Sequence, residues 1–227
     1  MCCFRTTVPK LCGLLFSIRA RRMSVESIRQ SKAVLRKVTS AKLKAMTPAQ
    51  VQTFSQAVVE QVLQHDKYLL ANRIACFISM PDEVDTTAII KDVFERSREL
   101  FIPRYHTGSN RMDMLSVGSM VELQSLPETS WGIKQHPTNF QAPDALQTGC
   151  LDLILVPGLA FTVSGHRLGR GKGYYDTYLK RALQSANPPV TMGLCFDQQV
   201  VDSIPVTPDD VTIQYIVTPS SRINQGG

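Results

Sequence analysis

The residues of this chain best suited to chemistry lie in one loop, 165–173, where Arg167, Arg170 and Lys172 stand among four glycines. Glycines let a backbone approach a phosphate group closely and adopt positive φ angles. A helix is predicted directly after the loop, and a helix N-terminus adds unpaired N–H groups and a positive dipole end. The loop therefore predicts a polyphosphate site, and Asp176 on that helix is expected to hold a divalent metal against the phosphate.

The glycine spacing separates this loop from two common nucleotide-binding motifs. In a P-loop the lysine is followed by serine or threonine, whereas Lys172 is followed by Gly173. Gly169, Gly171 and Gly173 alternate with other residues, which does not match the G-x-G-x-x-G fingerprint of dinucleotide-binding domains. A solvated basic turn is the alternative, but alternating glycines raise the entropy cost of folding, which favours a binding role.

The segments around the loop predict how it is positioned. The apolar run Leu151–Val156 precedes the loop and is typical of a buried strand, and residues 174–184 follow it as a helix. Strands and helices alternate along the chain, which predicts one three-layer α/β domain with a largely parallel, mixed sheet and helices on both faces. Ligands of such sheets bind at the carboxyl ends of the strands, where the loop lies. The other predicted helices are 24–46, 47–65 and 85–98, and the other predicted strands are 74–80, 100–103, 112–117, 191–196 and 213–218.

Three local patterns refine this outline. Residues 47–50 read Thr-Pro-Ala-Gln, the hydroxyl, proline and glutamine of a helix start. Residues 112–117 alternate apolar and polar side chains, which predicts a half-buried strand on a more exposed sheet. Residues 123–146 are rich in Pro, Thr, Gln and Asn, which predicts a loop with little regular structure.

Charge is distributed unevenly along the 227 residues. The net charge is +6, but residues 1–22 hold five cations and no acid, which leaves 20 basic against 19 acidic residues in residues 23–227. A nearly neutral body argues against a nucleic-acid-binding face. The apolar stretch 11–18 is too short to span a bilayer, so no membrane partner is expected.

The basic leader, residues 1–22, is predicted to be separate from the single domain that follows, residues 23–227. It is arginine-bearing, acid-free and contains hydroxyl residues, as mitochondrial transit peptides do. The alternative is an extension made from an upstream start, with Met23 as the working first residue. The location therefore stays open between the cytoplasm and the mitochondrial matrix.

The loop and its flanks closely resemble a signature of the 5-formyltetrahydrofolate cyclo-ligase family, also called methenyltetrahydrofolate synthetases. The matching residues read P-G-L-A-F at 157–161 and R-L-G-R-G-K-G-Y-Y-D at 167–176. Further segments occur in the family's order, so the resemblance covers most of the chain, roughly residues 30–218. These segments are S-K-A-V-L-R at 31–36, F-I-S-M-P-D-E at 77–83, F-I-P-R-Y at 101–105, M-D-M at 112–114, S-W-G-I at 130–133 and I-P-V-T-P-D-D at 204–210.

The resemblance assigns residues to two substrates, with Lys172 and Arg170 as the catalytic pair. Residues implied to bind ATP are Lys32, Arg36, Arg167, Leu168, Gly169, Arg170, Gly171, Lys172, Gly173, Tyr174 and Tyr175. Residues implied to bind the folate are Arg36, Ile78, Glu83, Trp131, Arg170, Gly171, Lys172, Gly173 and Tyr174. For Lys32 and Arg36, four residues apart on one helix face, an ordinary solvated pair is the alternative.

Acidic and aromatic residues complete the implied site. Asp176 and Asp210 are the implied Mg²⁺ ligands, with Asp209 as the alternative to Asp210. Glu83 is expected to accept hydrogen bonds from the amino-pyrimidine edge of the pterin, and Trp131 to form an aromatic wall. The role of Arg104, which either pairs with an acid or reaches a ligand phosphate, stays open.

By this resemblance the chain is an ATP-dependent carbon–nitrogen ligase of one-carbon metabolism. It converts ATP and 5-formyltetrahydrofolate to 5,10-methenyltetrahydrofolate, ADP and phosphate, with Mg²⁺ and through a phosphorylated formyl group, an iminium phosphate. The implied partners are these small molecules, and the expected state is a monomer. The alternative is a non-catalytic folate- or nucleotide-binding protein, or an RNA-associated relative of the same fold.

Overall fold

The computed structural model describes residues 24–225 and is built around a seven-stranded mixed sheet. Its five inner strands are parallel to one another, and one antiparallel strand closes each edge. This confirms the predicted sheet. In spatial order the strands are β3 (Met112–Val117), β2 (Glu99–Tyr105), β1 (Arg73–Ala75), β4 (Leu153–Val156), β7 (Val190–Leu194), β8 (Tyr215–Val217) and β9 (Arg222–Asn224).

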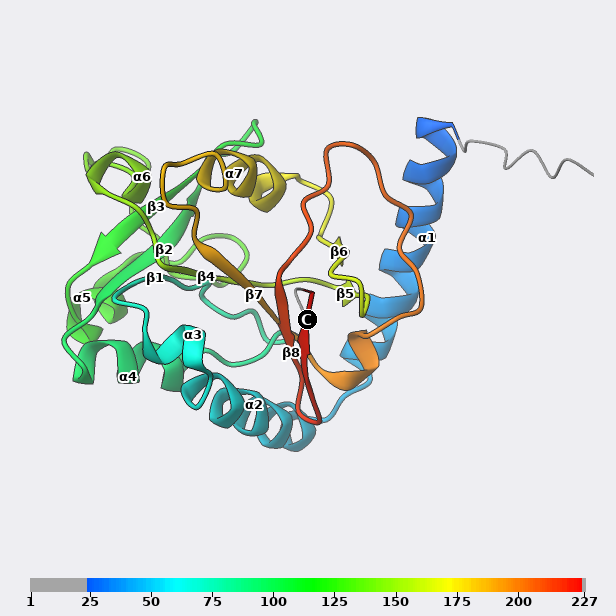
Figure 1. Ribbon diagram of the computed structural model, residues 1–227, viewed down its shortest axis with the longest axis horizontal. Helices are drawn as coiled ribbons and strands as arrows, with labels where there is room; N and C mark the ends of the chain where they lie inside the picture. The colour runs from blue at the N-terminus through cyan, green and yellow to red at the C-terminus, as the bar shows by residue number, and fades with distance from the viewer. Residues whose placement is uncertain (1–23, 226–227) are drawn as a thin grey trace, which may run out of the picture.

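Helices cover both faces of the sheet, so the predicted three layers are confirmed. Figure 1 shows α2, α3 and α4 below the sheet and α6 and α7 above it, with α1 standing to one side. None of the helices within residues 24–225 has the length and apolar character needed to cross a membrane. The helices are α1 (Val25–Lys44), α2 (Pro48–Leu63), α3 (Asp66–Leu69), α4 (Thr87–Glu95), α5 (Met120–Ser125), α6 (Ala145–Thr148) and α7 (Tyr174–Ala182), and a 3₁₀ turn spans Asp197–Gln199.

Local capping sets where the first helices begin. The Ser24 hydroxyl accepts from the Ser27 N–H and starts α1. Thr47 and Gln50 form the capping box that the sequence predicts at the start of α2. Both caps satisfy N–H groups that have no partner inside the helix, so each start is determined by residues within one turn.

Two predicted strands differ in extent and setting from the structure. The strand predicted over residues 74–80 leaves the sheet after Ala75, and the chain then turns at Met80 and Glu83, joined by a backbone hydrogen bond of 3.0 Å. The prediction that residues 112–117 belong to a more exposed sheet is wrong. They form the β3 edge of the same sheet, and five of the six are buried, because Asp113 is neutralised by neighbouring cations.

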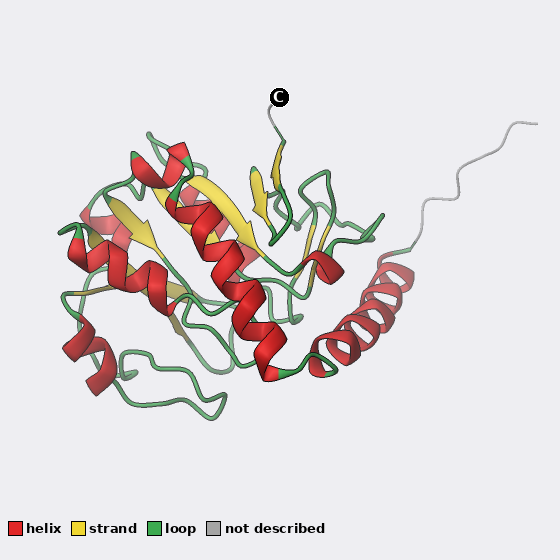
Figure 2. Ribbon diagram, turned by 90° about the horizontal axis from the view of Figure 1, so that it is seen from below, coloured by secondary structure: helices red, strands yellow, loops and turns green. Residues whose placement is uncertain are grey.

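A hairpin missed by the sequence overlaps the first residues of the phosphate loop, 165–173. Its strands, β5 (Ala160–Phe161) and β6 (Arg167–Leu168), pair antiparallel. Ala160, Leu168 and Ile204 form a small buried cluster, against which Leu35 of α1 packs. The hairpin therefore attaches α1, which Figure 2 shows beside the body, to the rest of the molecule.

Candidate active site

The phosphate loop lies where the prediction put it, at the carboxyl end of β4 and in front of α7. β4 ends at Val156, the β5–β6 hairpin follows, and Gly169–Gly173 lead into α7. Gly171 and Gly173 have φ angles of 97° and 74°, a region that glycine enters without strain. Tyr174 then begins the helix, so the N–H groups of its first turn border the loop.

The three cations of the loop point in different directions. The Lys172 side chain is exposed and makes no ion pair or side-chain hydrogen bond within residues 24–225. Arg170 crosses to the turn after β1, where its Nη2 lies 2.6 Å from Asp82 Oδ1 and 3.1 Å from Glu83 Oε1. Arg167 is buried and donates to Asp176 at 3.0 Å, so it faces the protein interior rather than the loop surface.

Helix α1 brings two further cations to the loop. The Lys32 Nζ lies 2.6 Å from both carboxylate oxygens of Asp210, and the Arg36 Nε donates to the Gly169 carbonyl at 2.9 Å. Burial alone raises the pKa of Asp210, but the hydrogen bonds from Lys32 and Thr207 outweigh it and hold that pKa below its ordinary value. Asp210 is therefore an ionised, paired carboxylate at neutral pH.

The two residues implied as metal ligands, Asp176 and Asp210, lie on segments that contact each other. Asp176 Oδ1 accepts from the Val211 N–H at 3.3 Å, and Val211 directly follows Asp210. Two carboxylates are enough for Mg²⁺, which usually adds phosphate oxygens and water, and the described residues contain no larger cluster of acids, histidines or cysteines. The donors fit this ion in kind, but Arg167 and Lys32 already neutralise them. Asp209, the alternative, pairs with Lys180 at 2.7 Å and is exposed.

An aromatic row borders the start of α7. The Tyr174 and Tyr105 ring centroids lie 4.9 Å apart, and the Trp131 ring meets Tyr105 edge-on at 5.8 Å. The Tyr174 hydroxyl also donates to the His106 carbonyl at 3.3 Å, which fixes the row to the β2–β3 turn. Tyr105 was not predicted as a site residue, although it ends the F-I-P-R-Y segment that carried part of the resemblance.

Glu83 lies at the junction of this row and the phosphate loop. One of its oxygens accepts from the Met80 N–H at 3.1 Å, and the other faces Arg170. Burial raises the pKa of Glu83 above its ordinary value, and the nearby Arg170 opposes that rise. Ile78, on the same turn, is half-buried and packs against the main core.

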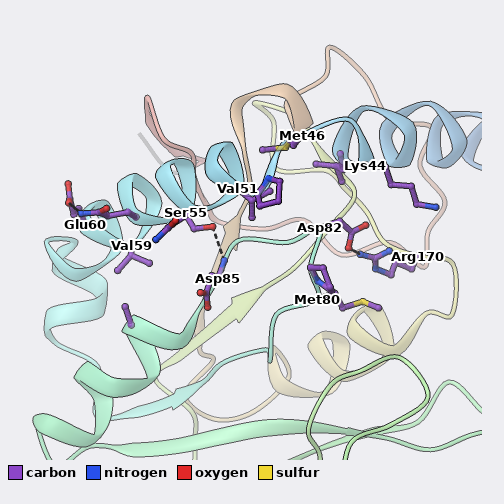
Figure 3. Close-up of a pocket in the computed structure, with 16 residues that line it drawn as sticks. Lys44, Met46, Val51, Ser55, Val59, Glu60, Met80, Asp82, Asp85 and Arg170 are labelled. Carbon is purple, nitrogen blue, oxygen red and sulfur yellow. Dashed lines mark hydrogen bonds and ion pairs between the residues drawn. The ribbon is translucent and has the colours of Figure 1, made fainter.

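A cavity of 1090 Å³ opens between the end of α1, α2 and residues 80–88. Its walls are largely apolar, with Met46, Val51 and Met80 among them, and Figure 3 shows Arg170 and Asp82 together at one side. The apolar walls suit a ring system, and the charged side suits a polar substituent.

A smaller cavity of 460 Å³ adjoins the first and is basic. Lys44 and Arg170 line both, and Arg36 and Lys37 complete the cations of the smaller one. The sequence prediction missed Lys37 and Lys44, because α1 carries many cations and nothing in the spacing shows which of them face a cavity.

Comparison with known proteins gives one consistent result. A model of the 5-formyltetrahydrofolate cyclo-ligase family matches residues 28–219. A 5-formyltetrahydrofolate cyclo-ligase from Mus musculus is 42% identical over 196 residues, covering 86% of this chain and 97% of the relative. A mitochondrial one from Arabidopsis thaliana is 33% identical, covering 88% and 78%. The solved structure of the Aquifex aeolicus 5,10-methenyltetrahydrofolate synthetase superposes with a TM-score of 0.71 at 26% identity, covering 86% of this chain and 93% of that one.

These matches extend across the sheet, the phosphate loop and the segments that supply Lys32, Glu83 and Asp210. The chain belongs to the 5-formyltetrahydrofolate cyclo-ligase family.

Proposed function

We propose that this chain catalyses the ATP-dependent cyclisation of 5-formyltetrahydrofolate to 5,10-methenyltetrahydrofolate, with release of ADP and phosphate. Family membership supports this activity. The observation that carries it in the structure is the position of Arg170, which lines both cavities. It joins the basic cavity, which suits a triphosphate, to Glu83, beside which the folate ring is placed. Of the residues implied to hold that ring, Arg170 alone is among those that line the apolar cavity.

The reaction needs ATP because an amide oxygen is a poor leaving group. Transfer of the γ-phosphoryl group to the formyl oxygen gives an iminium phosphate and ADP. The neighbouring nitrogen of the folate then attacks the formyl carbon, the carbon–oxygen bond breaks, and phosphate leaves with that oxygen. The protein's part is to align the two substrates and to neutralise the charge on the transferring group.

The cations of the loop and of α1 perform that neutralisation. Lys172 is exposed and has no ion pair with any described residue, so its ammonium group reaches the phosphoryl group without breaking such a contact. Arg170 exchanges its carboxylate partners for phosphate oxygens, which match the bidentate geometry of a guanidinium group. Arg36 and Lys32 add charge from α1, and the glycines at 169, 171 and 173 admit the phosphate chain.

The folate ring system lies between the aromatic row and the turn after β1. Tyr174 and Trp131 form its wall, and Ile78 contacts the ring. Glu83, released from Arg170 when the triphosphate binds, accepts hydrogen bonds from the amino-pyrimidine edge. Because burial raises the pKa of Glu83, this contact weakens as the pH falls and the carboxylate becomes protonated.

Asp176 and Asp210 are the residues that would hold Mg²⁺. When bound, this ion neutralises phosphate charge and orients the triphosphate. Arg167 and Lys32 orient the two carboxylates through ion pairs, and Lys32 helps to hold the pKa of Asp210 below its ordinary value. The proposed enzyme is a monomer, and its small-molecule partners are reduced folate and ATP.

An absorbance assay at the band of the methenyl product tests the proposal directly. The purified chain is mixed with 5-formyltetrahydrofolate in four reactions: with ATP and Mg²⁺, without ATP, without Mg²⁺, and with Mg²⁺ removed by EDTA. We expect product only when both ATP and Mg²⁺ are present, and one ADP per product. Folate binding without any ATP-dependent product would instead identify a non-catalytic relative.

A further inference from the structure

Arg104 on β2 is buried among charged and backbone partners, and no role has been assigned to it. Its Nη2 donates to Asp113 Oδ2 at 2.9 Å, and its Nη1 donates to the Phe140 carbonyl at 2.6 Å. Of the two roles that the sequence left open, the structure therefore pairs it with an acid. The carboxylate neutralises the guanidinium charge, which leaves the other nitrogen to hold a distant segment of backbone.

The segment that Arg104 holds joins α5 to α6 and has little regular structure of its own. Two residues that precede Phe140 by a few positions contact β2 and β3, the strands that carry Arg104 and Asp113. The Gln135 side chain accepts from the Tyr105 N–H at 3.2 Å, and the His136 ring nitrogen lies 3.0 Å from the Ser116 carbonyl. His136 also stacks on the Phe140 ring at 4.3 Å, so residues 135–140 are fixed as one unit.

Trp131 sits at the tip of the turn that precedes this unit. The turn is closed by the Thr129 N–H donating to the Ile133 carbonyl at 2.9 Å. Trp131 is 40% exposed, so its burial fixes it against Tyr105 only in part. Its position depends on where the backbone of the turn is attached.

We propose that Arg104 is a positioning residue: by tying the backbone at Phe140 to the sheet, it holds the Trp131 turn against Tyr105 and so sets the affinity for the folate ring. Arg104 touches neither substrate in this arrangement. The inference rests on the proposed role of Trp131 as a wall of the folate site.

The chain offers a reporter and a matched control for this proposal. Trp131 is its one tryptophan, so tryptophan fluorescence comes from this turn alone. Arg98 also caps backbone carbonyls, those of Tyr68 at 2.9 Å and Leu69 at 3.0 Å, but it lies just before β2 begins, at the opposite end of that strand from Arg104. Arg98→Ala therefore removes an arginine that, like Arg104, donates to backbone carbonyls, and it leaves the Trp131 turn untouched.

Two measurements are made on the wild type, Arg104→Ala, Arg104→Lys and Arg98→Ala. For Arg104→Ala we expect acrylamide to quench Trp131 about twofold more strongly without ligand, as a locally loosened segment requires. We expect its KM for 5-formyltetrahydrofolate to rise about tenfold, because the loss of one aromatic contact costs about that factor in affinity. Its kcat and its KM for ATP should stay within about twofold of the wild-type values. In Arg104→Lys, the quenching and the KM for 5-formyltetrahydrofolate should lie between those of Arg104→Ala and the wild type, because the single ammonium group keeps the ion pair with Asp113. Arg98→Ala should change neither the quenching nor this KM.

Unchanged quenching in Arg104→Ala, or an equal rise of both KM values, would overturn the proposal. If Arg104→Ala does not fold, the same two measurements on Arg104→Lys decide the question, since it too loses the second nitrogen. An inactive wild type would refute the proposed function instead, and the quenching comparison would still show whether Arg104 fixes the turn.

Discussion

The cations of the phosphate loop differ in what they contact, and this separates their roles. Arg167 is buried against Asp176 and Tyr175, which makes it a link between the hairpin and α7. Arg170 is paired with Asp82 and Glu83, the acids that a triphosphate displaces in the proposed function. Lys172 alone of the three is exposed and unpaired within the described chain, so its charge is available to a ligand without rearrangement.

Replacement of Lys172 tests this assignment at the level of one side chain. Lys172→Ala should lower kcat by about tenfold or more, because a positive charge near the transferring phosphoryl group is lost. The melting temperature should stay at the wild-type value, since the side chain has no partner to lose. Lys91→Ala, which removes an equally exposed lysine on α4, is the control and should leave both unchanged. Near-normal turnover in Lys172→Ala would remove Lys172 from the catalytic pair.

Among the elements, α1 depends most on its attachment to the loop region. Leu35 packs against the hairpin cluster, Lys32 pairs with Asp210, and Arg36 binds the Gly169 carbonyl. The opposite side of the helix leaves Val34 and Val38 exposed. The loop region thus holds in place the helix that brings Lys32 and Arg36 to it. In the proposed function, ligand binding at these cations is therefore coupled to the local stability of α1.

The turn of the β5–β6 hairpin is the tightest point of this arrangement. Gly165 has a φ angle of 81°, and a Cβ there would collide with the Ile213 carbonyl before β8. Gly108, in the β2–β3 turn, has a φ angle of 80° but open space around it. Gly108→Ala should therefore cost about 1 kcal/mol of unfolding free energy from backbone strain alone. Gly165→Ala should cost about 3 kcal/mol or more, because overpacking is added.

Urea unfolding of both variants measures this difference. Equal losses would mean that the chain before β8 moves aside, and that the hairpin is not fixed where the structure has it.

At the scale of the whole molecule, the site residues come together at the carboxyl ends of the parallel strands. β1 and β4 lie side by side and end at the turn that carries Glu83 and at the loop that carries Lys172. α1 and the segment before β8 complete the site from outside the sheet. The basic leader, residues 1–22, lies outside the described residues.

Removal of residues 1–22 tests whether the leader is an address or part of the enzyme. A chain that begins at Met23 should keep wild-type turnover and melting temperature, because every residue assigned to the site follows it. Fluorescent fusions of the full and shortened chains decide between the two alternatives for the leader: mitochondrial signal from the full chain alone identifies a transit peptide. Both fusions in the cytoplasm would favour the upstream-start alternative, and lost turnover would make the leader part of the enzyme.

The local patterns of the sequence determined the capping box at Thr47, the buried strand at Leu153–Val156 and the glycines that give the phosphate loop its φ angles. Each is set by residues within a few positions, where sterics and hydrogen bonding act directly. The alternation of strands and helices along the chain extended this to the three-layer α/β fold, which the structure confirms.

Only the tertiary structure decided which charges meet. Lys32 and Asp210 are 178 residues apart, and Arg170 finds Glu83 across 87 residues. Nothing local could show that Arg167 faces inward while Lys172 faces out, or that Arg104 meets Asp113 and the Phe140 carbonyl. The reason is physical: a backbone conformation depends on its neighbours in the chain, whereas the partner of a charge depends on which distant segments the sheet brings together.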